Sequence, residues 1–221
     1  MTRQEIHQHA KTAKRIEKDS FLLELCTGKV VLDVGCIGQD RDFSSPDWLH
    51  NKIRKVAQQI DGVDILVDQI NQLNAKGYSM YSVEELQSKA KAYDVVVISD
   101  VIEHVNDPVS FLSFYSRFLK ENGKIFVSTP NANRSINFVN ILFNNNYTVN
   151  PEHVFWFCPK TLLEVVLRAN LAVKDFYWAG NYFEMNEVKG MYQKFKILIS
   201  NLLFKVRPNF SPNMIFILTR K

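Results

Sequence analysis

Cysteine is scarce in this chain: it has three cysteines among 221 residues, and none of them forms a C-x-x-C pair. An odd number of isolated cysteines argues against a disulfide framework and against a zinc site built on thiolates. We therefore expect Cys26, Cys36 and Cys158 to be reduced thiols. Long apolar runs are missing too, because Lys196 and Lys205 interrupt the most hydrophobic stretch. No segment reaches the roughly 18 apolar residues that a membrane-spanning helix needs.

The first twenty residues lack the apolar core of a secretory signal, so we expect a cytoplasmic protein. With 46% hydrophobic and 23% charged residues, the composition is typical of a globular chain. Its length predicts a single domain over residues 1–221, since domains average about 150 residues. Within it we expect an N-terminal helical extension at 1–27 and a helical insertion or cap at 181–211.

Acidic residues are absent from the C-terminal part of the chain. No Asp or Glu follows Glu187, whereas seven Lys and Arg do, so the net charge of +4 leaves residues 1–187 at about −3. Basic character confined to one end is not typical of a nucleic-acid binder, and we expect no nucleic-acid partner. Residues 191–210 mix large apolar side chains with lysines. Such a helix could cap a site, dimerise, lie on an anionic membrane surface or simply pack on the sheet.

What the chain does contain is an alternation of short apolar runs with segments of helical period. This pattern indicates strands buried on both faces by crossover helices, and hence an α/β fold with a mostly parallel sheet. The runs cover residues 30–34, 63–67, 95–99, 125–128, 172–178 and 214–219, with a weaker one at 78–81. Helices are predicted over residues 4–25 and from the starts Ser45-Pro46, Asp107-Pro108 and Pro159.

Two strand ends carry residues suited to ligand binding. The first strand runs into Asp33, Gly35 and Gly38, and a glycine turn lets a ligand approach bare backbone amides. The second presents Asp64, placed to accept hydrogen bonds from a ribose diol. Either acid could instead be a plain strand-end or helix-capping residue. The fingerprint G-x-G-x-x-G is not met, which argues against the alternative of a nicotinamide-dependent oxidoreductase or epimerase.

A third strand end, at residues 93–105, supplies Ser99, Asp100, Glu103 and His104. With the two earlier elements, this series resembles the class I S-adenosylmethionine-dependent methyltransferases over about residues 30–171. The matching motifs are Val31-Leu32-Asp33-Val34-Gly35-Cys36, Gly62-Val63-Asp64, residues 93–105, Asn122-Gly123-Lys124-Ile125 and Ser128-Thr129-Pro130-Asn131. Pro151-Glu152-His153-Val154 is similar to the small-molecule branch that includes ubiquinone-type O-methyltransferases, and Trp48-Leu49-His50 to methyltransferases encoded with surface-polysaccharide synthesis.

The resemblance implies a Rossmann-like three-layer sandwich, whose seven-stranded, mostly parallel sheet has an antiparallel last strand at 214–219. It also implies S-adenosylmethionine as cofactor, bound by Asp33, Gly35, Cys36, Gly38, Asp64, Ile65, Ser82, Val83, Ser99 and Asp100. Two departures stand out. Cys36-Ile37-Gly38 replaces a glycine-rich loop, and Ser82 replaces an aspartate that meets the adenine. Losing one charge-assisted hydrogen bond, on the order of 1.5–3 kcal/mol, would weaken binding about ten- to a hundred-fold.

Methyl transfer from a sulfonium is a direct displacement, so the protein mainly aligns the reactants and removes a proton from an oxygen or nitrogen nucleophile. His153 and His104 are the candidate bases, because imidazole titrates near neutrality. In some quinone O-methyltransferases the matching Glu-x-x-Glu-His binds a divalent cation. Asp100, Glu103 and His104 are therefore an alternative metal set, and a pair that only orients the loop is a further alternative.

The sequence thus predicts a methyltransferase acting on an oxygen or nitrogen of a small molecule, a sugar or a lipid-linked precursor. A non-catalytic, methyltransferase-like binding module stays open, because the glycine loop and Ser82 depart from the family pattern. The acceptor itself is not encoded in these motifs, since variable loops build acceptor pockets. Oligomeric state is not encoded there either.

Overall fold

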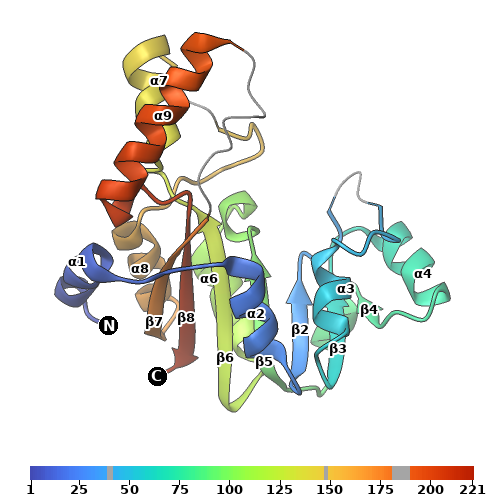
Figure 1. The fold of residues 1–221 in the computed structure, drawn as a ribbon. Coiled ribbons are helices and arrows are strands. Elements are labelled where there is room, and N and C mark those ends of the chain that lie inside the picture. The colour runs from blue at the N-terminus through green and yellow to red at the C-terminus, as the bar shows by residue number, and fades with distance from the viewer. Residues whose placement is uncertain (39–41, 147–148, 181–189) are drawn as a thin grey trace.

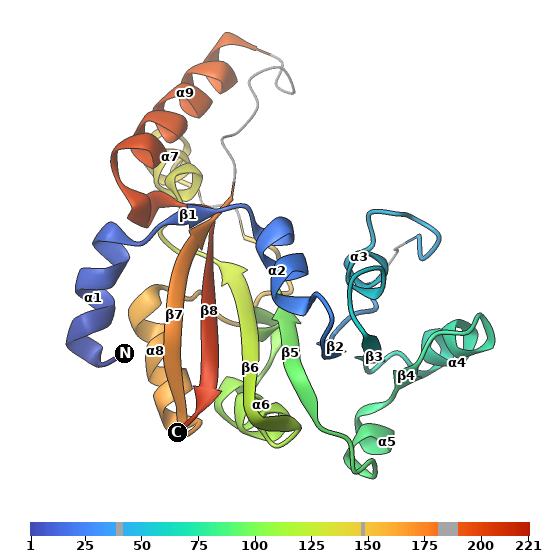
Figure 2. The ribbon, with the colours of Figure 1, turned by 60° about the horizontal axis from the view of Figure 1, so that its bottom comes forward.

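In the computed structural model, an eight-stranded sheet is flanked by helices on both faces (Figures 1 and 2). The structure describes residues 1–38, 42–146, 149–180 and 190–221. The strands are β1 (Arg15–Ile16), β2 (Val30–Val34), β3 (Gln59–Val63), β4 (Met80–Tyr81), β5 (Tyr93–Ser99), β6 (Leu119–Pro130), β7 (Leu171–Ala179) and β8 (Asn213–Arg220). The helices are α1 (Arg3–Thr12), α2 (Lys18–Cys26), α3 (Leu49–Arg54), α4 (Val67–Ala75), α5 (Val83–Gln87), α6 (Pro108–Ser116), α7 (Ser135–Asn144), α8 (Pro159–Arg168) and α9 (Met191–Val206), with the 3-10 turns η1 (Ile102–His104) and η3 (Pro208–Phe210).

The strand order is β1-β7-β8-β6-β5-β2-β3-β4, and within this sheet β8 alone runs antiparallel to its neighbours. This confirms the Rossmann-like α/β fold with an antiparallel last strand, which lies beside β6 as expected. The short edge strand β1 adds one strand to the seven predicted. The order in which the chain adds strands reverses between β2 and β5: β3 and β4 follow on one side, β6 on the other. In open α/β sheets, ligands bind outside the carboxyl ends of the strands at such a switch point.

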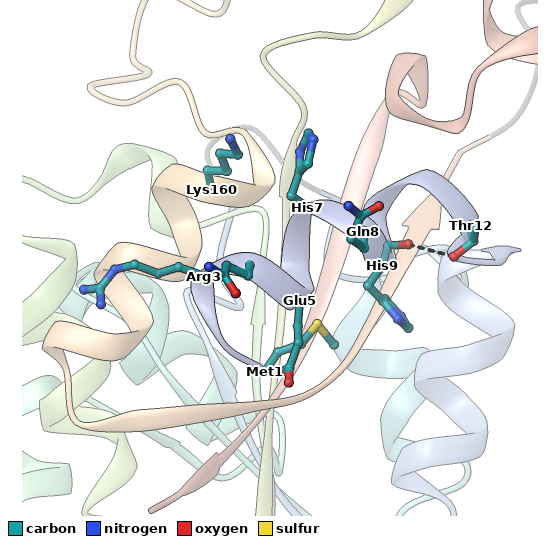
Figure 3. A pocket seen from close by; sticks show the side chains of 9 residues that line it. Met1, Arg3, Glu5, His7, Gln8, His9, Thr12 and Lys160 are labelled. Atoms are coloured by element: carbon teal, nitrogen blue, oxygen red, sulfur yellow. Dashed lines mark hydrogen bonds between the residues drawn. The ribbon is translucent and has the colours of Figure 1, made fainter.

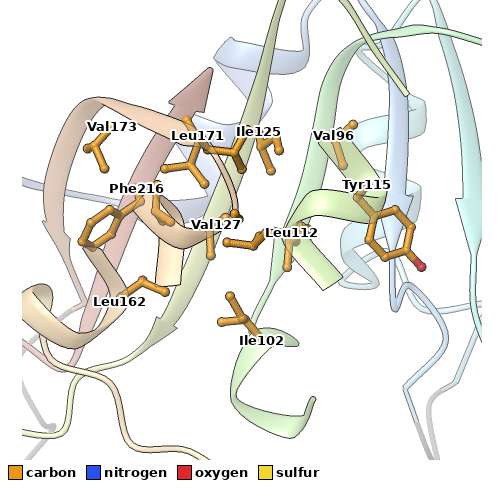
Figure 4. Packing of buried hydrophobic residues seen from close by; sticks show 14 of the residues in the cluster. Val96, Ile102, Leu112, Tyr115, Ile125, Val127, Leu162, Leu171, Val173 and Phe216 are labelled. Atoms are coloured by element: carbon orange, nitrogen blue, oxygen red, sulfur yellow. The ribbon is translucent and has the colours of Figure 1, made fainter. Parts of the chain in front are cut away.

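Strict alternation along the central strands builds two cores, and Figure 4 shows part of the one that contains Val96 and Leu112. On β5, Val96 and Ile98 face the core covered by α1, α6 and α8, whereas Val95 and Val97 face the core covered by α2 and α3. All four side chains are buried. Because each buried Val or Ile contributes about 1.5–3 kcal/mol, the paired layers hold the strand ends of the sheet in fixed register.

Two predicted boundaries are wrong. The second strand covers Gln59–Val63 rather than residues 63–67. Its Asp61 is completely buried, with hydrogen bonds from Tyr93 Oη and Lys91 Nζ at 2.8 Å each. A paired buried carboxylate breaks the apolar run that the sequence search relied on. The single helix predicted over 4–25 is two helices, α1 and α2, separated by β1.

Helix starts divide in the same way. Asp107-Pro108 and Pro159 do open α6 and α8, and Asp107 accepts a hydrogen bond from the Ser110 N–H. Ser45-Pro46 does not open a helix: residues 45–48 form turns, and α3 begins at Leu49. There the Ser45 hydroxyl accepts from the Asp47 N–H instead.

Helices α7 and α9 pack on each other beyond the carboxyl edge of the sheet (Figure 1). No helix is predicted from the sequence at the position of α7. The helical insertion or cap predicted at 181–211 includes α9, while its residues 181–189 lie outside the described part of the chain. Among the described helices, none has the length and apolar character needed to span a bilayer.

Candidate active site

A cleft of about 670 Å³ opens at the carboxyl ends of β2, β3 and β5. Nine of the ten predicted cofactor residues line it: Asp33, Gly35, Cys36, Gly38, Asp64, Ile65, Val83, Ser99 and Asp100. The residues that sequence reasoning did not single out include Lys18, Asp19, Phe111, Tyr115 and Asn150, while Glu152, from the motif before α8, also lines the cleft. The cleft therefore brings together strand-end residues with side chains from α2, α6 and the loop before α8.

Gly35, directly after β2, gives the cleft a stretch of open backbone. Its φ is +67°, in the left-handed region that favours glycine, and a Cβ at this position would lie 2.7 Å from Val101 Cγ2. A side chain at this position would both strain the backbone and crowd Val101, so the turn requires glycine. This observation supports the glycine-turn interpretation of the sequence.

Asp64 joins the loops after β2 and β3. Its Oδ2 accepts a hydrogen bond from the Ile37 N–H at 2.8 Å, and its Oδ1 accepts from the N–H groups of Ile65 at 2.8 Å and Leu66 at 3.3 Å. Burial raises the pKa of this carboxyl group above its ordinary value. Two carboxylate oxygens offer about four acceptor sites, so the geometry leaves capacity for a ligand hydroxyl.

At the end of β5, Asp100 adopts a left-handed backbone with φ 55°. Lys18 Nζ donates to its Oδ2 at 2.5 Å, and the Ser128 hydroxyl donates to its Oδ1 at 3.1 Å. Lys18 is the first residue of α2 and enters the cleft from the N-terminal part of the chain. No local sequence signal points to this contact, because it joins two distant parts of the chain.

Ser82 is the predicted cofactor residue that does not line the cleft. Its hydroxyl accepts from the Glu85 N–H at 3.1 Å, while the Glu85 carboxylate accepts from the Ser82 N–H at 2.8 Å. The two residues form a capping box at the start of α5. The S-x-x-E spacing carried this signal in the sequence, and the neighbouring Val83 reaches the cleft instead.

The two candidate bases lie side by side. His104 lines the cleft, and the His153 ring meets it edge to face with 4.6 Å between ring centroids. The loop of His153 docks on η1, since the N–H groups of Val154 and Phe155 donate to the Glu103 carbonyl at 2.9 and 3.1 Å. Burial, with a contribution from His104, lowers the pKa of His153 below 6.5.

Glu103 lies beneath this pair and is almost fully buried. Its Oε2 accepts from the Thr129 hydroxyl at 3.0 Å, whereas its Oε1 has no hydrogen-bond partner among the described residues. Burial, reinforced by the charge of Asp100, raises the pKa of Glu103 to about 7. A carboxyl group in this setting is poised between its acid and base forms near neutral pH.

Two groups of described residues bring ligand atoms within 4.8 Å of one another. One is Glu103, His104 and His153, so His153 stands where the sequence placed Asp100. Asp100 lies outside this group because it precedes the 3-10 turn and pairs with Lys18. The other is Asp33, Cys36 and His50. There, burial raises the pKa of the Cys36 thiol well above its ordinary value, so the thiol keeps its proton in this structure.

A second hollow, of about 1010 Å³, runs along α1 (Figure 3). Its lining consists of α1 and neighbouring N-terminal residues together with Lys160 of α8. It contains none of the predicted site residues. We therefore place the candidate active site in the cleft at the strand ends.

The sequence model of a protein family described as a methyltransferase domain matches residues 5–175. This chain belongs to the methyltransferase domain family. The expectation of a class I S-adenosylmethionine-dependent methyltransferase is thereby confirmed. A ubiquinone biosynthesis O-methyltransferase of Xanthomonas oryzae pv. oryzae (strain PXO99A) is 30% identical over 132 residues, which cover 56% of this chain and 52% of that protein. The chain thus spans about half the length of this relative.

Solved structures share the fold. A SAM-dependent methyltransferase of Archaeoglobus fulgidus aligns over 100% of this chain and 95% of its own, with a TM-score of 0.61 and 18% identity. A magnesium protoporphyrin IX methyltransferase of Synechocystis PCC 6803, solved with bound SAH, aligns over 99% of this chain and 83% of its own, with a TM-score of 0.56 and 10% identity. At these identities the likeness concerns the fold, and function is argued from the site.

Proposed function

We propose that this protein transfers the methyl group of S-adenosylmethionine to an oxygen or nitrogen of a small molecule. The observation that carries the proposal is the convergence of Asp33, Asp64 and Asp100 on one cleft at the β2–β5 switch point, beside His104. Family membership supports it independently.

The residues present fit the cofactor. Bound there, S-adenosylmethionine supplies a methyl group on a positively charged sulfur. Open backbone at Gly35 allows close approach of the cofactor. Asp64 offers hydrogen-bond acceptor capacity to its ribose, and Ile65 and Val83 offer apolar surface to its adenine ring. The other predicted contacts, with Cys36, Gly38, Ser99 and the Asp100 carboxylate, complete the proposed set. The Ser82 side chain is engaged in its capping box. We therefore assign the cofactor contact expected of Ser82 to the neighbouring Val83.

We assign the proton acceptor to the pair of His104 and His153. His104 touches the cleft, and His153 lies against it in a partly buried position that disfavours the imidazolium form. A neutral imidazole can remove a proton from an acceptor hydroxyl or amine. Glu103 fixes the backbone of the His153 loop through its carbonyl.

The acceptor we favour is a hydroxyl on a sugar or lipid-linked precursor. The curated relative is named for an O-methylation in ubiquinone biosynthesis. Besides Asp33, Asp64 and Asp100, three further acids line the cleft: Asp19, Asp47 and Glu152. Like charges repel the phosphates of a nucleic acid, which supports a small acceptor.

The helical pair α7 and α9 supports peripheral contact with an anionic membrane. Large apolar side chains on it are half or more exposed: Phe138, Ile141, Leu142, Met191, Tyr192, Phe195, Leu198, Leu202 and Val206. Residues 131–146 and 190–212 contain no Asp or Glu, while Lys194 and Lys205 are exposed cations. Apolar area combined with positive charge is complementary to an anionic lipid surface.

With Cys26, Cys36 and Cys158 unpaired, we propose a cytoplasmic location.

Calorimetry with S-adenosylhomocysteine tests the core of this proposal. We expect saturable binding, together with transfer of labelled methyl from S-adenosylmethionine to a hydroxylated acceptor. NADH fluorescence should not change on mixing. No heat at millimolar S-adenosylhomocysteine would overturn the proposal, and binding without transfer across acceptor panels would favour a non-catalytic module.

A further inference from the structure

The loop after β2 keeps Gly35 and Gly38 but has Cys36-Ile37 between them in place of a glycine-rich sequence, and in this structure a neighbouring segment holds it. Trp48 Nε1 donates to the Cys36 carbonyl at 2.8 Å. His50 Nδ1 lies 2.9 Å from Asp33 Oδ2, and these two side chains are 1% and 4% exposed. Trp48, just before α3, thus binds the loop after β2, and His50, within α3, binds Asp33 in β2.

An aromatic cluster makes this arrangement rigid. The Trp48 and His50 rings stack at 5.0 Å between centroids with 28° between their planes. Phe43 at 5.2 Å and Tyr78 at 5.4 Å pack against Trp48, and Tyr78 Oη donates to Asn51 Oδ1 at 2.9 Å. A buried indole whose N–H has a partner combines large apolar contact with one fixed direction.

The Asp33 carboxylate has a particular need for its partner. It is buried at the end of the strand yet belongs to the cleft lining. A buried carboxylate without a hydrogen bond is costly and turns toward whatever donor it can reach. The imidazole of His50 supplies that donor, so the carboxylate and the Cys36–Ile37 backbone are held in place before any ligand arrives.

We propose that Trp48 and His50 are positioning residues that pre-organise Asp33 and the Cys36–Ile37 backbone for the cofactor. This inference rests on the proposed cofactor function. Preformed sites bind more tightly because less ordering occurs on binding. The prediction is therefore an effect on cofactor affinity that is separable from any effect on folding.

Three variants test it, with the dissociation constant of S-adenosylhomocysteine and the urea midpoint measured on each full chain. His50→Phe keeps a ring and removes the donor, and we expect affinity to fall about tenfold or more. His50→Asn places an amide N–H near the position of Nδ1 and should restore affinity to within about threefold of the parent. Trp48→Phe keeps the packing, removes the indole N–H, and should weaken binding several-fold.

The outcomes are distinct. A purely structural role would lower the urea midpoint of all three variants and leave the dissociation constant of the folded protein unchanged, which would overturn the inference. Equal weakening by His50→Phe and His50→Asn would overturn it as well, because the donor would then be irrelevant. If His50→Phe does not fold, Trp48→Phe and His50→Asn still decide. Failure of the parent protein to bind S-adenosylhomocysteine would instead overturn the proposed function.

Discussion

The rings of His104 and His153 meet edge to face at 4.6 Å between centroids, although one follows β5 and the other lies in the loop before α8. Their meeting depends on the Glu103 carbonyl, which accepts two N–H groups of the 154–155 backbone. Whichever imidazole takes the proton, its neighbour sits within direct electrostatic reach. The pair is therefore best treated as one functional unit.

Replacing either histidine should slow methyl transfer without releasing the cofactor. We expect His104→Gln and His153→Gln each to lower kcat by about 10²–10⁴, the usual contribution of general base catalysis. The dissociation constant of S-adenosylhomocysteine should stay unchanged. Because burial lowers the pKa of His153 below 6.5, activity should persist down to pH values under 6.5 before its acid limb begins. The exposed His7→Gln is the control, and unchanged kcat in both site variants would contradict the assignment.

Asp64 should dominate ribose binding. Asp64→Ala removes the acceptor of three backbone N–H groups, so we expect S-adenosylhomocysteine affinity to fall about ten- to a hundred-fold. Asp64→Asn retains one acceptor oxygen and should lose less. Asp68→Ala, an exposed acid on α4, is the matched control. Calorimetry on folded protein measures all three, and full affinity in Asp64→Ala would show that the ribose contact is misassigned.

Gly35 and Gly77 allow backbone strain to be separated from close approach. Both have positive φ, but a Cβ at Gly77 meets nothing within 4 Å, whereas a Cβ at Gly35 meets Val101 at 2.7 Å. Gly77→Ala should cost about 1–2 kcal/mol of unfolding free energy from the left-handed backbone alone. Gly35→Ala should cost more and also weaken S-adenosylhomocysteine binding. Equal urea midpoints for the two variants would argue against the Val101 contact.

Glu103 makes stability depend on pH. Its pKa rises from 4.5 to about 7 on folding, so the folded state favours the protonated form. The stability it contributes is fully present below pH 4.5 and is lost as pH rises through about 7. The shift corresponds to about 3 kcal/mol. Glu103→Gln should remove this loss, so that the variant gains stability over the parent at pH 8 but not at pH 4. Parallel urea midpoints for the two proteins across this range would contradict the shift.

The α7–α9 pair should bind vesicles that contain phosphatidylglycerol, and should release them as salt rises, because the attraction is partly electrostatic. Lys194→Glu with Lys205→Glu should abolish co-sedimentation. Leu142→Ser with Leu198→Ser should weaken it at any salt. Lys11→Glu with Lys14→Glu makes the same charge change on and just after α1 and should have no effect. Equal binding to neutral phosphatidylcholine vesicles would argue against charge recognition.

The sequence by itself determined the layered α/β architecture, because apolar runs buried on both faces can only be satisfied by helices on both sides of a sheet. It also placed Asp33, Asp64 and Asp100 at strand ends, because the order of residues along the chain decides which of them a strand ends on. Since parallel strands end at one carboxyl edge, these three acids lie along the same edge. Asp107-Pro108 likewise carries its own helix start, as the cap and the proline act within one turn.

Only the tertiary structure decided which distant groups meet. Lys18 of α2 reaches Asp100, His50 pairs with Asp33, and His153 rather than Asp100 joins Glu103 and His104. The buried Asp61, paired with Tyr93 and Lys91, hid β3 from a search for apolar runs. These contacts depend on how loops close over the sheet, and the energy of a long-range pair is absent from any local pattern of residues.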